Sequence, residues 1–303
     1  MSSKLILTYI NNKDKYSDGE DENKLLEIFN GDNVQQVIKD ILENDPSWPM
    51  RYHLSPVREN LLNWYDFDSN KTILEIGAGC GAVTGTLCNK LKKVTAIELT
   101  EMRSKIIAAR HKDKKNLTVI AGNLNDIVLK EKFDYVSLIG VLEYAGKYTQ
   151  TQSPFIDFLS KAKTHLKKNG TLIIAIENKF GLKYWAGCKE DHTGKFFDSI
   201  ENYPTDLGVK TFSKNELEEM VKSVGLDKVN FYYPLPDYKL PTEIFSDKYL
   251  PTLRHNIKSN IFPFEDYSQD RMNLFNEKLV MDNIIANNKF DFFANSFLIF
   301  AKQ

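Results

Sequence analysis

The chain has 303 residues, of which 42% are hydrophobic, and it carries 40 lysines and arginines against 41 acidic residues, for a net charge of −1. The apolar content suffices for the core of one large α/β domain with additions, and the charge balance lacks the basic bias of a dedicated DNA- or RNA-binding surface. Three cysteines without metal-ligand spacing indicate reduced thiols. There is no signal-peptide profile, and no run approaches the roughly 20 apolar residues of a membrane span. We therefore expect a cytoplasmic protein that has no membrane span.

The first part of the chain, residues 1–50, is expected to form an N-terminal extension ahead of a catalytic domain over 51–303. Residues 4–10 have the pattern of a short strand, and one or two helices follow to about residue 44. Beyond them, apolar residues recur at helical spacing. We therefore predict one helix whose buried face is made of Leu54, Val57, Leu61, Leu62 and Tyr65.

From residue 72 onward, apolar strands alternate with helical or mixed stretches, which is typical of a doubly wound parallel α/β sheet. A sixth strand is predicted at 228–236 and a last one at 294–302. Before the sixth strand, Ser213 and Glu216 have the spacing of a capping box that begins a helix. The first five strands are predicted over 72–76, 94–98, 117–121, 134–139 and 171–177.

Two long insertions interrupt this alternation, at 178–212 after the fifth strand and at 235–292 after the sixth. Non-sheet segments of this length inside a compact domain are uncommon unless they are functional. We expect both to form lids over the carboxyl ends of the strands, with their aromatic side chains lining one deep pocket. An exposed Tyr184 or Trp185 would favour a binding role there.

The most informative segment is ILEIGAGCGAVTG at 73–85. A buried strand runs into a turn with Gly77, Gly79 and Gly81, which lets the backbone turn sharply and approach a ligand closely. The next strand ends on Glu98, at the distance at which a strand and helix unit returns an acid to a bound ribose. The third glycine comes one residue early for a dinucleotide motif, so we expect a nucleoside cofactor, and a nicotinamide oxidoreductase is disfavoured.

This strand, its turn and the two acids Glu75 and Glu98 resemble the first motif of the class I S-adenosylmethionine-dependent methyltransferases. The resemblance implies a seven-stranded Rossmann-like sheet with an antiparallel last strand, and S-adenosyl-L-methionine as the cofactor. Glu75 would serve the amino acid end of the cofactor and Glu98 both ribose hydroxyls, while Asn123 stands where most members have an aspartate beside the adenine. The cofactor-binding residues that the resemblance implies are Tyr52, Ser55, Arg58, Glu75, Gly77, Ala78, Gly79, Gly81, Glu98, Leu99, Asn123, Leu124, Gly140 and Val141.

A narrower resemblance rests on five further segments. They are similar to a subfamily of bacterial methyltransferases found free-standing or fused to glycosyltransferases of cell-surface polysaccharide biosynthesis. This resemblance implies O-methylation of a sugar, nucleotide sugar or surface glycan, and a glycosyltransferase as a partner. The segments are YHLSPVRENLLNW, ENKFGLKYWAGCKEDHTG, TFSKNELEEM, YPLPDYKLP and FANSFL.

A hydroxyl acceptor requires a general base, and histidine is the side chain best suited near neutral pH. His192 is our candidate, because it follows Glu190 and Asp191 in the first insertion. His53 is the second choice and is expected to make a structural hydrogen bond. His111, which lies in a run of charged residues, is expected to face solvent.

We expect no metal site. Some methyltransferases hold a divalent ion with a Glu, a second Glu three residues on and an adjacent His after the fourth strand. The corresponding residues here are Gly140, Glu143 and Tyr144, so most of that set is missing.

Two other functions stay open at this point. N- or carboxyl-methylation of a small metabolite would use the same cofactor half. A catalytically silent module that binds a glycosyltransferase would use the fold alone, but such a scaffold has no need of Glu75 and Glu98.

Overall fold

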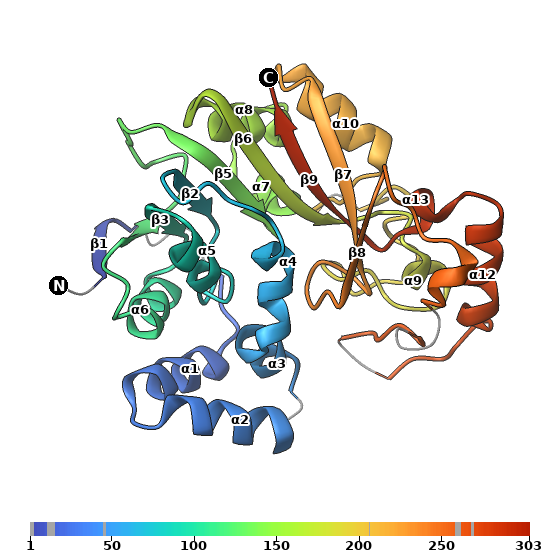
Figure 1. The fold of residues 1–303 in the computed structure, drawn as a ribbon, viewed down its shortest axis with the longest axis horizontal. Helices are drawn as coiled ribbons and strands as arrows, with labels where there is room; N and C mark the ends of the chain where they lie inside the picture. The colour runs from blue at the N-terminus through green and yellow to red at the C-terminus, as the bar shows by residue number, and fades with distance from the viewer. Residues whose placement is uncertain (1–2, 11–15, 45–46, 206, 258–261, 268–269) are drawn as a thin grey trace. The chain divides into compact units, whose positions relative to one another are not determined.

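The computed structural model describes residues 3–10, 16–44, 47–205, 207–257, 262–267 and 270–303 (Figure 1). Its contacts divide the chain into two compact units. The first is Met1–Ile139 with Lys161–Leu172, and the second is Gly140–Ser160 with Ile173–Gln303. The predicted division into an extension, 1–50, and a domain, 51–303, stays a prediction. Within the described ranges, no helix has both the length and the apolar character needed to cross a membrane.

The strands are β1 (Lys4–Tyr9), β2 (Thr72–Ile76), β3 (Lys93–Glu98), β4 (Leu117–Gly122), β5 (Phe133–Ile139), β6 (Leu166–Glu177), β7 (Lys228–Leu235), β8 (Glu243–Ser246) and β9 (Ser296–Lys302). The α-helices are α1 (Glu20–Asn30), α2 (Val34–Asn44), α3 (Trp48–Leu54), α4 (Asn60–Asn63), α5 (Thr84–Lys90), α6 (Glu101–Arg110), α7 (Ala145–Tyr148), α8 (Pro154–Thr164), α9 (Leu182–Trp185), α10 (Lys214–Ser223), α12 (Glu277–Ala286) and α13 (Phe290–Phe293). Short 3₁₀ helices are η1 (Pro56–Glu59), η2 (Leu142–Tyr144) and η3 (Leu253–His255).

In the first unit the strand order is β1-β4-β3-β2-β5, followed by the first part of β6. The pairs β1 with β4, β4 with β3, β3 with β2 and β2 with β5 are all parallel. The parallel strands predicted from apolar runs are confirmed with shifts of one residue at their ends, except β6, which begins at Leu166 and not at 171. Parallel strands align their carboxyl ends at one edge, so the turns after β2, β3 and β4 lie at the same edge.

In the second unit the order is the second part of β6, then β9, β7 and β8 (Figure 1). The last strand, β9, is antiparallel to β7, as predicted, and β8 is antiparallel to β7. The described strands therefore form a mixed sheet of nine, and the predicted count of seven is wrong. The two additional strands are β1, from the N-terminal segment, and β8, from the second insertion; each adds to an edge that would otherwise present unpaired backbone groups.

The single helix predicted over 54–65 is also wrong. Helix α3 ends at Leu54, and the chain continues as η1 and α4. Pro56 explains the break, because proline disfavours helical geometry in the residue before it, and Ser55 has extended backbone angles of φ −62° and ψ 127°. The Ser55 hydroxyl accepts a hydrogen bond from Val57 N at 3.3 Å and begins the next segment.

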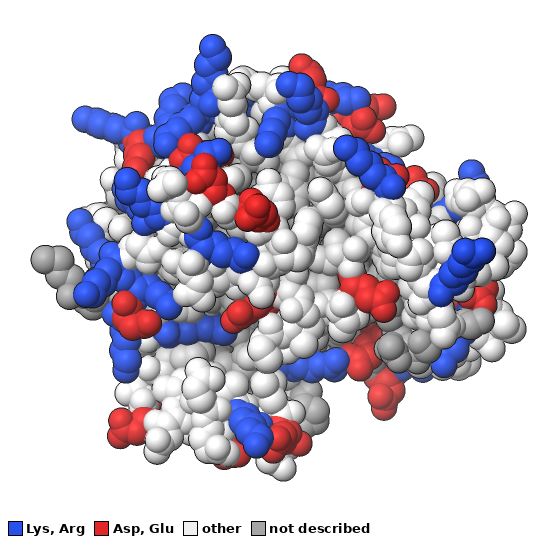
Figure 2. All heavy atoms as spheres, viewed as in Figure 1, with Lys and Arg blue, Asp and Glu red and all other residues white. Residues whose placement is uncertain are grey.

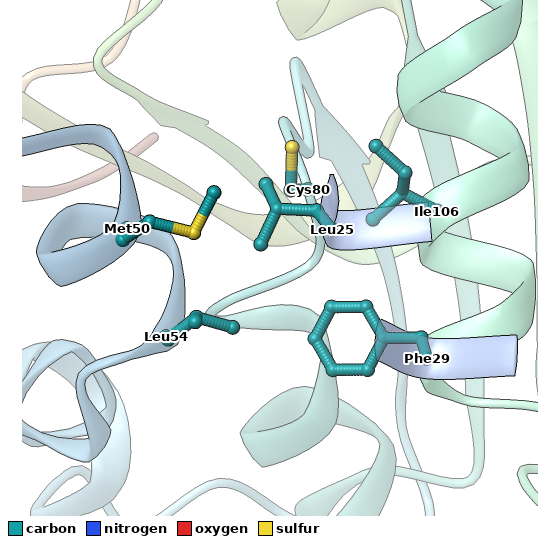
Figure 3. Packing of buried hydrophobic residues seen from close by; sticks show 6 residues of the cluster. All are labelled: Leu25, Phe29, Met50, Leu54, Cys80 and Ile106. Atoms are coloured by element: carbon teal, nitrogen blue, oxygen red, sulfur yellow. The ribbon is translucent and has the colours of Figure 1, made fainter. Parts of the chain in front are cut away.

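The N-terminal helices pack on the sheet unit through an apolar cluster (Figure 3). In this unit α1 packs against α6, and α2 against α1 (Figure 1). The cluster joins side chains of α1, α3, α6 and the turn after β2, and all of them are buried. Its members are Leu25, Phe29, Met50, Leu54, Cys80 and Ile106. The N-terminal segment thus supports the underside of the glycine turn.

Candidate functional site

The turn after β2 has the backbone that its glycines predict. Gly77, Gly79 and Gly81 have φ values of 69°, 57° and 77°, a region that residues with a side chain rarely adopt. Gly77 N and Ala78 N donate to Ile97 O at 2.8 and 3.1 Å, which ties the turn to β3. At Gly79 an added Cβ would meet no atom within 4 Å, so the space beside this glycine is open to a ligand.

Glu98 joins this turn from the end of β3. Its Oε2 accepts a hydrogen bond from Gly79 N at 2.7 Å and its Oε1 one from Thr100 N at 3.3 Å. Burial raises the pKa of Glu98, and the charge of Arg103 opposes that shift. A carboxylate has about four acceptor sites, so both oxygens can still accept a hydroxyl each. This geometry fits the predicted role of Glu98 toward a ribose.

Glu75 lies below the same turn and is 4% exposed. The Thr84 hydroxyl donates to its Oε2 at 2.7 Å. Burial raises the pKa of Glu75 to about 8, with a contribution from the charge of Glu98, while the nearby Arg58 lowers it. Arg58 in turn donates from Nη2 to the Tyr52 hydroxyl at 3.1 Å and lies 4.3 Å from the centre of that ring. Arg58, with Tyr52 beside it, therefore lies near enough to Glu75 to influence its pKa, and the contacts of Tyr52 and Arg58 with the cofactor remain predictions.

The other predicted residues of the first unit follow the strand ends. Leu99 is half-buried after β3, and Asn123 and Leu124 are buried after β4. The Asn123 Oδ1 accepts a hydrogen bond from Asn125 N at 3.0 Å, which shapes the loop after β4. Their contacts with the cofactor remain predictions.

His111 is not solvated, and that expectation is wrong. It is 7% exposed, and its Nε2 lies 2.8 Å from Gly81 O, to which it donates. Added Cβ atoms at Gly81 and Gly85 would lie 3.1 and 2.9 Å from the His111 ring. Both glycines thus leave room for the ring under the turn. Burial lowers the pKa of His111 to about 4, so the ring is neutral.

His53 and Cys80 have structural environments. His53 Nε2 lies 2.9 Å from Asp18 Oδ2 and 3.9 Å from Cys80 Sγ, and the ring is 3% exposed. Asp18 also accepts from Arg103 Nη2 at 2.5 Å. Burial raises the pKa of the Cys80 thiol to about 12, so the thiol stays protonated and packs in the apolar cluster of Figure 3.

In the second unit, Gly140 and Val141 follow β5. Gly140 has a φ of 67°, and its N–H donates to Ala175 O at 2.9 Å. An added Cβ at Gly140 would lie 2.7 Å from the Tyr238 hydroxyl oxygen. That hydroxyl donates to Oε1 of Glu177 at 3.3 Å. One tyrosine therefore separates Gly140 from a buried carboxylate at the end of β6.

His192 lies in this acidic region, and its side chain is 5% exposed. Its Nδ1 is 3.0 Å from Glu190 Oε1, and its backbone N–H donates to Glu190 Oε2 at 2.8 Å. Its Nε2 faces Glu143 Oε1 at 3.7 Å and Glu177 Oε2 at 3.8 Å. Burial disfavours the charged imidazolium, but the carboxylates of Glu177, Glu143 and Glu190 outweigh burial and raise the pKa of His192 well above 6.5.

Two buried lysines border these acids. Lys183 Nζ lies 2.5 Å from Asp191 Oδ2 and 3.7 Å from Asp237 Oδ2. Lys239 Nζ lies 3.0 Å from Asp191 Oδ2 and also pairs with Glu177 Oε1. Although burial opposes it, the two ammonium groups hold the pKa of Asp191 well below its usual range.

Sequence reasoning missed most of this second group. Glu177 ends a buried apolar strand, TLIIAIE, in the same way as Glu98 ends VTAIE, so the same signal was available for it. Lys183, Asp237 and Lys239 carry no such signal. Charged residues in irregular segments usually face solvent, and only the packing of the insertions shows that these are buried.

A family model described as "Methyltransferase domain" matches residues 74–172. A ribosomal RNA small subunit methyltransferase A of Mycoplasma mycoides is 28% identical over 240 residues, which cover 70% of this chain and 88% of the relative. A protein of the same name from Fusobacterium nucleatum is 31% identical over 65 residues, 22% of this chain and 25% of the relative. A chain from a Haloferax volcanii complex of a methyltransferase and its activator has a TM-score of 0.49 at 15% identity, over 84% of this chain and 91% of that one.

The family match identifies a methyltransferase domain in the segment that contains the glycine turn and Glu98. The predictions of a methyltransferase enzyme and of S-adenosylmethionine as its cofactor are confirmed at this level. The match begins within β2 and ends within β6, so it includes the glycine turn, Glu98 and Glu143, and it leaves out Glu177, Glu190 and His192.

Proposed function

We propose that this chain transfers a methyl group from S-adenosylmethionine to a hydroxyl of a sugar, nucleotide sugar or surface glycan. The observation that carries the proposal is the buried His192, held against three glutamates in the same unit as Gly140, the glycine predicted to lie beside the methyl donor. An alcohol has a high pKa and is a poor nucleophile near neutral pH, so its methylation calls for such a proton acceptor. An amine acceptor would not need it.

The residues of the first unit would hold the cofactor through the hydrogen bonds of Glu98 and the open space at Gly79. Glu98, fixed by Gly79 N and Thr100 N, would accept hydrogen bonds from the ribose hydroxyls, and the open space at Gly79 would admit the ligand. When bound, S-adenosylmethionine supplies a methyl group activated by the sulfonium. Displacement of this kind depends on alignment, so the main contribution of the chain is to hold the acceptor in line.

His192 would act as the general base. Glu190 holds the ring through Nδ1, so that Nε2 faces Glu143 and Glu177. The three carboxylates favour the protonated ring, so His192 can accept the acceptor's proton only after it has released its own, and we expect turnover to rise with pH as that proton dissociates. Glu143, whose pKa is raised by burial, is the next candidate for this role.

The sugar acceptor and the glycosyltransferase partner rest on the narrower sequence resemblance. The segments 177–194 and 233–241, which carry it, supply Glu177, His192 and Lys239 to one buried group. Trp185, within the first insertion, is 39% exposed, which suits stacking on a sugar face, whereas Tyr184 is fully buried. The three free, buried cysteines accord with the proposed cytoplasmic location.

A ribosomal RNA acceptor is the second candidate, and only the names of the curated relatives favour it. Against it, the net charge is −1, and on the face in Figure 2 the basic and acidic side chains are interspersed. N- or carboxyl-methylation of a small metabolite and a silent module remain further alternatives. Incubating the chain with labelled cofactor and either nucleotide sugars, small amines or ribosomal RNA separates these acceptors by which one becomes labelled.

The proposal is tested by His192→Gln. We expect turnover with a hydroxyl acceptor to fall roughly 100- to 10,000-fold, the usual scale for a lost acid–base group, while S-adenosylmethionine affinity stays unchanged. His255→Gln, a change of the same type at η3 in the same unit, is the control and should retain activity. If His192→Gln turns over the hydroxyl acceptor as fast as the unmodified chain, His192 is not the general base.

A further inference from the structure

Three buried carboxylate oxygens in the second unit have no hydrogen-bond donor of their own, and two of them face one imidazole nitrogen. Within the described ranges, neither side-chain oxygen of Glu143 has a hydrogen-bond partner, and neither does Oε2 of Glu177. The two side chains are 1% and 0% exposed. Their distances of 3.7 and 3.8 Å to His192 Nε2 exceed those of a hydrogen bond. Buried polar atoms are almost always satisfied, so these oxygens point to a missing ligand.

We infer that Glu143, Glu177 and Nε2 of His192 form a binding site for a divalent cation. Each side chain offers one ligand atom, and these atoms all lie within 4.8 Å of one another. Ligand atoms at about 2.1 Å from a common cation are up to about 4 Å apart, so only small side-chain movements are needed. The three residues come from η2, the end of β6 and the first insertion, which makes the site a product of the folded unit.

The charge of the surrounding group supports a cation. Four buried carboxylates, the 16% exposed carboxylate of Asp191 and two ammonium groups are joined by ion pairs, so three negative charges remain with His192 neutral and two with it protonated. Buried charge without a counterion is costly, and one divalent cation bound at neutral His192 would offset two of these three negative charges. The groups are Glu143, Glu177, Glu190, Asp191 and Asp237 with Lys183 and Lys239.

The neighbours of the three ligands hold them in the way that metal sites require. Histidine ligands usually donate their second ring nitrogen to a carboxylate, and here Nδ1 of His192 lies 3.0 Å from Glu190 Oε1. Glu190 itself accepts from Thr193 N at 2.7 Å and the Tyr203 hydroxyl at 3.2 Å, so its own position is fixed. Glu177 is oriented through its other oxygen by Lys239 and Tyr238.

The ligand types select the cation. Two carboxylates suit hard cations and one imidazole nitrogen suits first-row transition metals, so we expect Mn²⁺ or Zn²⁺ in preference to Mg²⁺ or Ca²⁺. This site differs from the set whose absence led us to expect no metal, because Glu177 and His192 are far along the chain from Glu143.

A cation here would change the role of His192 in the proposed reaction, and this part alone rests on the proposed function. A cation bound at Nε2 takes the place of the proton, so His192 would be a ligand in the loaded enzyme. An acceptor hydroxyl bound to the cation would lose its proton to water more easily, because a divalent cation lowers the pKa of a bound hydroxyl.

The test is direct binding of Mn²⁺ alone to the full chain, after treatment with a chelator and desalting. Titration calorimetry in two buffers of different ionisation enthalpy would measure affinity and proton release together. We expect one Mn²⁺ per chain, release of protons on binding, and a rise in the thermal midpoint of the unmodified chain. Glu143→Gln and His192→Gln should abolish binding, and Glu190→Gln should weaken it roughly 10- to 100-fold.

The matched control is Glu201→Gln, the same change at an exposed acid of the same insertion; it should bind Mn²⁺ as the unmodified chain does. The inference is overturned if neither Mn²⁺ nor Zn²⁺ binds at millimolar concentration, or if Glu143→Gln binds as tightly as Glu201→Gln. Methyl transfer that survives chelation with the cation removed would overturn the cation's part in the reaction and leave the proposed function intact. One Mn²⁺ bound with no hydroxyl acceptor methylated would support the site while the proposed function fails.

Discussion

Glu98 is held by two backbone N–H groups at the turn after β2, so its carboxylate is positioned before any ligand arrives. We predict that Glu98→Ala weakens binding of S-adenosylmethionine by removing two charge-assisted hydrogen bonds, about 1.5 to 3 kcal/mol each before compensation. Calorimetry measures the change. Glu101→Ala, at an exposed acid three residues along, should bind as the unmodified chain does, and equal affinities for both variants would contradict the role of Glu98.

The open space at Gly79 leads to a second residue-scale prediction. Gly79→Val should abolish cofactor binding, because the new side chain would occupy that space, and it should also cost stability through its φ of 57°. Gly19→Val separates the two effects, since Gly19 has a φ of 68° and equally open surroundings away from the turn. If Gly19→Val also loses binding, backbone strain and not lost space is responsible.

Glu75 gives stability a pH dependence. Its pKa is 4.5 when unperturbed and about 8 in the folded chain, so the folded state holds its proton more tightly. Its stabilising contribution is complete below pH 4.5 and is lost as the pH rises toward 8. In Glu75→Gln, which cannot ionise, the free energy of unfolding should fall less over this window. Urea unfolding at the two ends of this pH window measures the free energy of unfolding of both chains. If that free energy falls equally in Glu75→Gln and in the unmodified chain, the prediction is wrong.

At the scale of elements, α10 shows that a local pattern can be sufficient. Ser213 accepts from Glu216 N at 3.3 Å while the Glu216 carboxylate accepts from Ser213 N at 2.7 Å, which is the predicted capping box. Ser213→Ala should lower the free energy of unfolding by about 1 kcal/mol, within a range of roughly 0.5 to 2. Ser223→Ala at the other end of α10 should have a smaller effect. A larger loss in Ser223→Ala would mean that the cap contributes little.

The segment 48–63 shows the opposite case. Its apolar spacing is helical, yet Pro56 divides it into α3, η1 and α4. The division places Arg58 beside Tyr52 and Glu75, so a backbone rule that the periodicity ignores decides where a predicted cofactor residue lies.

For the whole molecule, the insertions 178–212 and 235–292 are predicted to be lids. Binding of S-adenosylhomocysteine with an acceptor should then slow amide hydrogen exchange in both insertions, while α1 and α2 change little. Hydrogen exchange read by mass spectrometry measures this. Unchanged exchange in both insertions under saturating ligand would contradict the lid prediction.

The sequence alone determined the cofactor half of this protein. Three local patterns indicate this half: a glycine turn with positive φ, an acid at the end of each of two strands, and the alternation of strands. Local patterns can be interpreted without knowledge of the tertiary structure. Only the tertiary structure decided the rest. Glu143, Glu177 and His192 come together because β6 and the first insertion return to η2, and His111 is buried because two glycines leave room for its ring. Burial and charge compensation depend on neighbours that are distant in sequence, and no local pattern specifies them.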